Sequence, residues 1–550
     1  MRKHIMDKYK SSVNLAIIPS KIYIIIFAMT LCVSSVIFFI PKIIVPQYFG
    51  YLLLIILFII PLFYATIGDN SLSIYLFFIG SVSTYLFLIA VDPVEYGLFG
   101  HDPYSFTLPA HQIMISNKPP IFEFINLTES WPAFYSLTTI LVQITQIETI
   151  VMAKYIPLIG ATIPLLFFIT LRNLMTDKIA FVAALGFTST RTLPLFEAKF
   201  IDETLAVVLF FNLILVFSIE YILVDGFQLG IQITGLLLLF TIILTHPIIS
   251  LLSIMFIFIW SGSTKILALD LVPNRYKSID QNVMSPTIMY GIIGACLFAI
   301  VAINSDLTVD SIVSLIVSAQ TGSGQEVPGP TTGQTIRNLI SASAIVVLLI
   351  FSAITAYGFL SSNNYQPWVN SWAIFAGIIG LIYASSLILG RLIPLDPIRL
   401  LIIFIPILIA VSIFILHESK TTYSTLFLDT ITNILIISLI VTQVAAIGPH
   451  VLYSDPSGTN LQEGHYTKEQ FTASEWANNY NDLQIVSYEG GLYVSRGTER
   501  VTSYQSMSSK CNNRLYSWRE ESGQAIPVNN NLIYTSGGVK LSLCNLHDES

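Results

Sequence analysis

Charged residues are scarce in this sequence: Asp, Glu, Lys and Arg make up 11% of the 550 residues, whereas hydrophobic residues make up 54%. A soluble domain carries roughly 25% charged residues, so this chain cannot cover a globular surface with charge. The net charge of −7 is spread along the chain without a basic run, which argues against a nucleic acid partner. A Walker phosphate loop and a glycine-rich dinucleotide loop are also missing, which argues against a nucleotide-driven pump.

Cysteine is scarce as well, with four residues and no paired-cysteine metal motif. Cys32 and Cys296 lie in apolar segments, whereas Cys511 and Cys544 lie in the polar C-terminal part. Only the second pair is a plausible disulfide, and only if that part of the chain lies outside the cell.

Long apolar segments fill most of the chain, and the mean hydropathy is +0.73. They are about 17 to 24 residues long, enough for a helix to cross roughly 30 Å of hydrocarbon. We therefore predict an α-helical polytopic membrane protein with about thirteen transmembrane helices. The predicted crossings lie at about 22–40, 49–67, 74–91, 150–170, 179–196, 203–223, 229–245, 247–260, 287–304, 337–360, 369–389, 398–416 and 424–447.

Basic residues set the expected orientation through the positive-inside rule, because Arg2, Lys3, Lys8 and Lys10 precede the first crossing and place the N-terminus in the cytoplasm. The apolar stretch Trp131–Thr145 is short, and we interpret it as an interfacial or partly re-entrant helix. A single crossing at 150–170 then keeps Arg172 and Lys178 in the cytoplasm. A tight turn at His246-Pro247 is expected to separate two crossings; one kinked helix there would reverse the later topology.

The predicted topology divides the chain into a transmembrane domain, 1–447, and an external soluble domain, 448–550. Loops 92–148 and 305–336 are external, and the second is rich in Gly, Ser, Thr and Pro, which predicts a mobile loop. In the tail, Thr467-Lys-Glu-Gln470 is a capping box that opens a helix. Short alternating runs around 483–488, 492–495 and 532–536 predict strands, so we expect a small α+β domain.

Four polar clusters lie on the predicted external face. They are Asp92–Tyr104, the segment Glu197–Glu203, Glu326 in the mobile loop, and Arg391–Arg399. Carboxylates suit Mg²⁺ or Mn²⁺, and arginines suit a phosphate, so the clusters together fit a lipid-linked phosphosugar. Each acidic residue taken singly is also explained as a turn former or a helix cap.

Two of these segments carry a family resemblance. Gly100-His-Asp102-Pro-Tyr104 resembles a loop motif of the GT-C class of membrane glycosyltransferases, and within that class of the archaeal-type oligosaccharyltransferase catalytic subunits. Phe200-Ile-Asp202-Glu203-Thr-Leu is similar to their second acidic motif, 100 residues further along the chain. The C-terminal part lacks the Trp-Trp-Asp-Tyr-Gly motif that reads peptide acceptors in that family.

The resemblance implies an external active site that takes a sugar or oligosaccharide from a polyprenyl- or dolichyl-phosphate donor. Asp102 and Asp202 would be the catalytic and metal-binding carboxylates, with Glu203 in support and Glu326 completing the metal site. The lipid phosphate would be bound by Arg391 and Arg399.

Two other functions remain open from the sequence. A transporter or flippase of lipid-linked sugars would place charged residues near the middle of the membrane and would contain paired broken helices. A polysaccharide polymerase or ligase would not need the Asp102 and Asp202 pair. Near the first motif, His101 and His111 are either solvated side chains or members of a metal site.

Overall fold

The computed structural model describes the helical part of the chain and five strands. The described residues are 20–39, 47–67, 71–91, 132–147, 149–199, 201–222, 229–268, 285–304, 332–361, 367–388, 397–418, 425–451, 485–487, 501–503, 514–519, 530–536 and 539–544.

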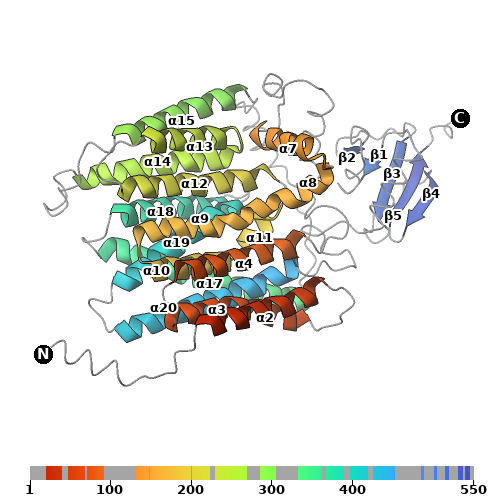
Figure 1. Cartoon of the computed structure of the whole chain (residues 1–550). Helices are drawn as coiled ribbons and strands as arrows, with labels where there is room; N and C mark the ends of the chain where they lie inside the picture. The colour runs from red at the N-terminus through yellow and green to blue at the C-terminus, as the bar shows by residue number, and fades with distance from the viewer. Residues whose placement is uncertain are drawn as a thin grey trace, which may run out of the picture.

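Apolar helices packed side by side form the body of the molecule (Figure 1). The longer helices are α2 (Ser20–Phe39), α3 (Gln47–Ile67), α4 (Leu72–Val91), α12 (Asp202–Ile222), α13 (Leu229–Ile243), α14 (Pro247–Ala268), α15 (Ser285–Asn304), α17 (Thr332–Ser361), α18 (Pro367–Ile388), α19 (Pro397–Glu418) and α20 (Thr425–Val451). The shorter ones are α7 (Pro132–Thr145), α8 (Thr149–Tyr155), the 3₁₀ helix η2 (Ile156–Thr162), α9 (Ile163–Leu174), α10 (Asp177–Thr188) and α11 (Thr192–Glu197).

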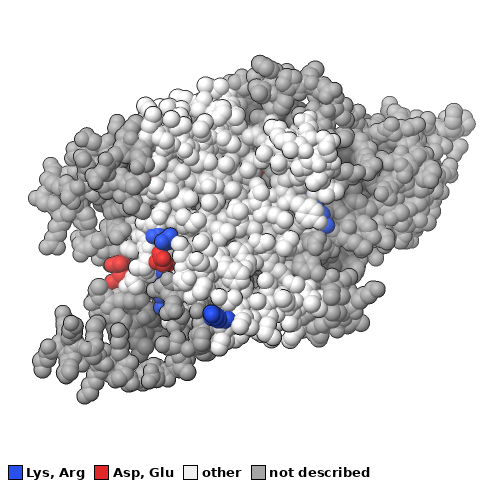
Figure 2. All heavy atoms as spheres, viewed as in Figure 1, with Lys and Arg blue, Asp and Glu red and all other residues white. Residues whose placement is uncertain are grey.

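Several of these helices are long and apolar enough to cross a membrane. Among the described residues, five meet this condition by length and composition, and further apolar helices are shorter. Figure 2 shows that most of the described surface in that view is uncharged. In a bilayer, a helix satisfies its backbone hydrogen bonds internally, so an uncharged helical surface suits lipid. The chain is a multi-pass membrane protein, and the count of thirteen crossings stays a prediction.

The segment after the first loop folds as the sequence predicts. The helix α7 is separate and short, whereas α8, η2 and α9 follow one another and supply one candidate span, Val151–Leu174. Gln146, in the turn between α7 and α8, has φ 57°. This left-handed conformation ends α7 and lets the chain change direction. The predicted interfacial position of α7 stays a prediction.

One predicted crossing is not a single helix. The span 179–196 divides into α10 and α11, with a break at Ser189–Arg191. Pro194 explains the break, because it has no N–H and its ring would collide with the carbonyl of Thr190 in a continuous helix. The hydroxyls of Ser189 and Thr190 donate to the Gly186 and Phe187 carbonyls, each at 2.7 Å, and stabilise the turn.

The turn at His246 does separate two helices, as predicted. The helix α13 ends at Ile243, α14 begins at Pro247, and the two pack against each other (Figure 1). The Ser250 hydroxyl donates to the Ile242 carbonyl at 3.0 Å and ties the two helix ends together. The predicted loop 305–336 is shorter than expected at its end, because its residues from Thr332 onward belong to α17.

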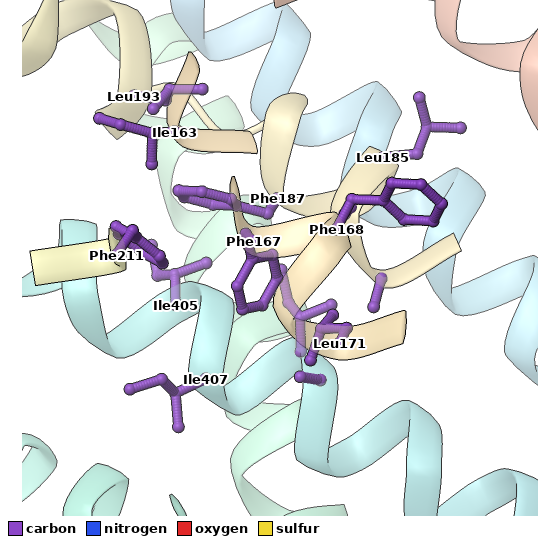
Figure 3. Close-up of a cluster of buried hydrophobic side chains, with 14 of the residues drawn as sticks. Ile163, Phe167, Phe168, Leu171, Leu185, Phe187, Leu193, Phe211, Ile405 and Ile407 are labelled. Carbon is purple, nitrogen blue, oxygen red and sulfur yellow. The ribbon is translucent and has the colours of Figure 1, made fainter. Parts of the chain in front are cut away.

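Aromatic side chains fill the centre of the bundle. Figure 3 shows Phe167, Phe187 and Phe211, from α9, α10 and α12, pointing toward one another. The ring centroids of Phe167 and Phe187 are 5.3 Å apart, and Trp372 of α18 stacks on Phe167 at 6.3 Å. Such pairs contribute about 0.5–1.5 kcal/mol each beyond their buried area. Because lipid removes the hydrophobic drive between helices, close packing of this kind holds them together.

The described C-terminal residues form one five-stranded sheet of order β2-β1-β3-β5-β4. Its strands are β1 (Ile485–Ser487), β2 (Val501–Ser503), β3 (Arg514–Arg519), β4 (Asn530–Ser536) and β5 (Val539–Cys544). β1 runs parallel to β2 and β3, whereas β5 runs antiparallel to β3 and β4. Two predicted strands, 483–488 and 532–536, are confirmed as β1 and β4. The predicted strand 492–495 lies outside the described residues, so the small α+β domain stays a prediction. The predicted helix after Thr467 lies outside the described residues.

Candidate functional site

Two predicted carboxylates open α12 and are buried. Asp202 and Glu203 are its first residues, and their exposed fractions are 8% and 1%. A helix N-terminus carries a partial positive charge, which favours carboxylates in the first turn. Burying an ionised carboxylate costs several kcal/mol unless charge or hydrogen bonds compensate it, so this pair is a functional candidate rather than a solvated helix cap.

A third carboxylate lies just before this pair. Glu197 ends α11, and its side chain is fully buried. The Thr204 hydroxyl, in the first turn of α12, reaches back to the Lys199 carbonyl at 3.0 Å and to the Glu197 carbonyl at 3.4 Å. The short connection between α11 and α12 is therefore held to the start of α12. We call Glu197, Asp202 and Glu203 the acidic group.

The last turn of α4 adjoins the acidic group. A Cβ atom at Gly160 of η2 would lie 3.1 Å from the Glu197 carbonyl oxygen and 2.6 Å from the Phe87 ring. Glycine thus allows three chain segments to meet at van der Waals distance. Phe87 belongs to α4, which ends at Val91 and leads into the segment that carries Asp102. The end of α4, which leads toward Asp102 in the sequence, therefore lies near the acidic group.

The helix α11 has many neighbours for its length: it contacts α4, α12, α19 and α20. Before it, Arg191 is half-buried, and its backbone N–H donates to the Gln443 side-chain oxygen of α20 at 3.2 Å. Arg191 therefore belongs to the segment that leads to the acidic group, and its side chain is a guanidinium, a group that binds anions.

Of the residues selected from the sequence, the described structure contains side chains for Asp202 and Glu203. The backbone of Arg399 lies in the first turn of α19, which contacts α11, and Cys544 ends β5. The other selected residues lie outside the described residues: Asp102, Glu326, Arg391, Cys511, His101 and His111. It stays a prediction that Asp102, Glu326 and Arg391 lie close to the acidic group. The disulfide between Cys511 and Cys544 also stays a prediction.

No group of three or more His, Cys, Asp or Glu side chains in the described part of the chain could hold a metal ion. Asp202 and Glu203 nevertheless supply carboxylate oxygens, the ligand type that Mg²⁺ and Mn²⁺ prefer. They could form part of a cation site, and the predicted remainder, Asp102 and Glu326, lies outside the described residues.

The sequence pattern assigns no role to Arg191 or His246, and it marks Glu197 only as a member of the predicted polar cluster Glu197–Glu203. Glu197 belongs to a cluster visible in the sequence, but its complete burial depends on the packing of α11. Arg191 lies within the predicted apolar crossing 179–196. The run of three polar residues that it forms with Ser189 and Thr190 is the sequence feature that indicates a break there. His246 lies in the predicted turn, and its burial, with 5% of its surface exposed, depends on helix packing that the sequence does not show.

The sequence matches no protein-family model and no curated protein. Its structure resembles that of ArnT from Cupriavidus metallidurans bound to undecaprenyl phosphate, with a TM-score of 0.50 and 9% identity. That similarity covers 87% of this chain and 99% of ArnT.

The oligosaccharyltransferase of Archaeoglobus fulgidus is also similar. Its apo form gives a TM-score of 0.48 at 12% identity, covering 78% of this chain and 64% of that protein. Its complex with Zn and sulfate gives a TM-score of 0.45 at 13% identity, covering 77% and 62%. This chain thus spans less than two-thirds of the archaeal protein. At a TM-score of 0.50, the similarity to ArnT shows that the chain has the fold of GT-C membrane glycosyltransferases, as the resemblance of the Asp102 and Asp202 segments implies.

Proposed function

We propose that this protein is a membrane glycosyltransferase that moves a sugar or oligosaccharide from a polyprenyl- or dolichyl-phosphate donor to an acceptor on the external face. The observation that carries the proposal is the buried acidic group at the α11–α12 junction of a GT-C fold. The undecaprenyl phosphate bound to ArnT supports a lipid phosphate as the donor's leaving group.

The reaction requires an acceptor hydroxyl or amide to attack the anomeric carbon while the bond from that carbon to the phosphate oxygen breaks. A carboxylate of the site would accept a hydrogen bond from the acceptor and orient it, and Asp102 or Asp202 would take this role. The departing phosphate needs positive charge around it, and Arg391 and Arg399 would supply guanidinium donors.

A divalent cation, Mg²⁺ or Mn²⁺, would add further charge stabilisation to the leaving phosphate when bound. Asp202 and Glu203 would hold it together with Asp102 and Glu326. Zn and sulfate in the archaeal oligosaccharyltransferase complex are compatible with a site of this kind.

Separate Asp102→Ala and Asp202→Ala variants test the proposal through sugar transfer from a lipid-phosphate donor in membranes. Loss of several kcal/mol of transition-state stabilisation corresponds to a rate at least about 100-fold lower in each variant. Asp177→Ala is the matched control, because Asp177 is an acidic residue in the first turn of another helix, α10, and pairs with Arg172 at 3.0 Å. We expect the control to keep its transfer rate.

Full transfer in both aspartate variants would contradict the carboxylate mechanism. If the wild type moves the intact lipid-linked sugar across the bilayer without transferring it, the flippase alternative holds instead.

A further inference from the structure

The corner between α13 and α14 carries a buried histidine at the same end of the bundle as the acidic group. His246 is 5% exposed and immediately precedes α14. The helix α7 connects the two places: its Ala133 N–H donates to the Leu244 carbonyl at 3.0 Å, and α7 also contacts α12.

Ring contacts fix the register of α12 and α14. Phe210 lies 6.0 Å from Phe256, and Phe217 lies 6.5 Å from Trp260, so the two helices run parallel. At 1.5 Å per residue, Phe210 is about 12 Å along the axis from Asp202, and Phe256 is about 15 Å from His246. His246 and the Asp202–Glu203 pair therefore lie within one helical turn of the same level.

The hairpin of α12 and α13 gives the same register independently. A Cβ atom at Gly235 would lie 3.5 Å from Val216, and these two residues are equally far from the facing ends of their helices. From this contact, Val216 leads back along α12 to its first turn, and Gly235 leads forward along α13 to the α13–α14 corner. The corner and the first turn of α12 therefore lie beside each other. Packed helix axes are about 8–10 Å apart, a gap that a histidine and a carboxylate side chain can span together.

The hydrogen bonding of His246 defines which ring nitrogen carries its proton. The Ile249 N–H donates to His246 Nδ1 at 3.4 Å, so Nδ1 is the acceptor that caps α14. A neutral imidazole with Nδ1 as acceptor carries its proton on Nε2. His246 thus presents an Nε2–H donor, which suits a carboxylate oxygen and cannot at the same time ligate a metal ion.

We propose that His246 is a positioning residue, whose Nε2–H holds a carboxylate of the Asp202–Glu203 pair in the orientation needed to bind a divalent cation. This inference rests on the proposed function. Hydrogen bonds of this kind to metal-binding carboxylates typically change metal affinity by about 10- to 100-fold.

Two variants separate positioning from helix capping in the full-length protein. His246→Asn places its side-chain oxygen where Nδ1 lies and keeps the α14 cap, but has no donor at the Nε2 position. His246→Gln keeps a donor near the Nε2 position and gives up the cap. Ser250→Ala is the control, because its hydroxyl bonds the Ile242 and His246 carbonyls at the same corner.

The readouts are Mn²⁺ affinity by electron paramagnetic resonance, sugar transfer and the thermal midpoint. We expect His246→Asn to bind Mn²⁺ at least about 10-fold more weakly at an unchanged midpoint. His246→Gln should keep the wild-type affinity at a lower midpoint, and Ser250→Ala should lower only the midpoint. The inference would be overturned if His246→Asn bound Mn²⁺ with the wild-type affinity, or if His246→Gln bound it as weakly as His246→Asn does. If the wild type still transfers sugar in either case, the proposed function stands. A wild type with neither activity nor Mn²⁺ binding would overturn the proposed function as well.

Discussion

Single residues decide how closely chain segments approach around the acidic group. Gly160 lies against the Phe87 ring and the Glu197 carbonyl, where a larger side chain has no room. Thr204 instead supplies a hydroxyl that holds the connection between α11 and α12. Both residues act on the position of Glu197 although neither carries a charge.

Gly160→Ala should destabilise the protein, because its Cβ would meet ring and backbone atoms at 2.6–3.1 Å. Overpacking of this kind costs about 1–3 kcal/mol, so the thermal midpoint in detergent should fall. Gly377→Ala is the matched control, since a Cβ there meets nothing within 4 Å. Equal midpoints for the two variants would show that the junction of α4, η2 and α11 can expand freely.

Thr204→Val removes the hydroxyl at nearly constant volume and leaves the Lys199 carbonyl without this donor. We expect a loss of about 1–3 kcal/mol of stability and slower sugar transfer, because the Glu197–Glu203 connection loosens. Thr204→Ser keeps the hydroxyl and should restore transfer. Transfer that is unaffected in Thr204→Val would show that the hydrogen bonds do not position the acidic group.

At the scale of elements, the break between α10 and α11 is what delivers Glu197 to α12. A continuous helix over 179–196 would carry Arg191 and Glu197 further along the α10 axis. The break instead turns α11 toward α4, α19 and α20, and the Gln443 side chain accepts the Arg191 N–H. The site thus depends on an irregular element between two regular ones.

Pro194→Ala tests the break. Alanine provides the missing N–H and favours continuation of α10, so we expect slower sugar transfer from a bundle that unfolds at the same or a higher temperature. Pro61→Ala is the control, because Pro61 lies inside α3 without dividing it. Faster or unchanged transfer in Pro194→Ala would mean that the break has no functional role.

At the scale of the whole molecule, the acidic group, the end of α4 at Val91 and the α13–α14 corner lie at one end of the bundle. The sheet of β1 to β5 lies beside that end in Figure 1, near α7 and α8. This arrangement agrees with a site outside the cytoplasm, because the predicted topology places the C-terminal part outside.

Alkaline phosphatase, which is active outside the cytoplasm, should therefore be active when fused after Ser550 and inactive when fused before Met1. Green fluorescent protein, which fluoresces in the cytoplasm, should show the opposite pattern. The physical reason is the basic N-terminus, which favours the cytoplasmic side. Paired alkaline phosphatase and green fluorescent protein fusions measure both locations. A cytoplasmic signal after Ser550 would imply an even number of crossings.

The sequence alone determined that this is a helical membrane protein and where most of its helices lie, although the predicted crossing 179–196 is divided into α10 and α11. Segment length against bilayer thickness and internal backbone hydrogen bonding are local properties, so apolar blocks such as Leu72–Val91 are readable without tertiary information. The Asp202–Glu203 pair was readable too, because charge at the end of an apolar segment is conspicuous.

The tertiary structure decided which polar groups are buried together. Burial of Glu197 and the position of His246 at the axial level of Asp202 arise from contacts between helices. The break at Ser189–Arg191, by contrast, has a local cause in Pro194. No local pattern encodes the contacts between helices, because close packing between helices depends on the shapes of both partners.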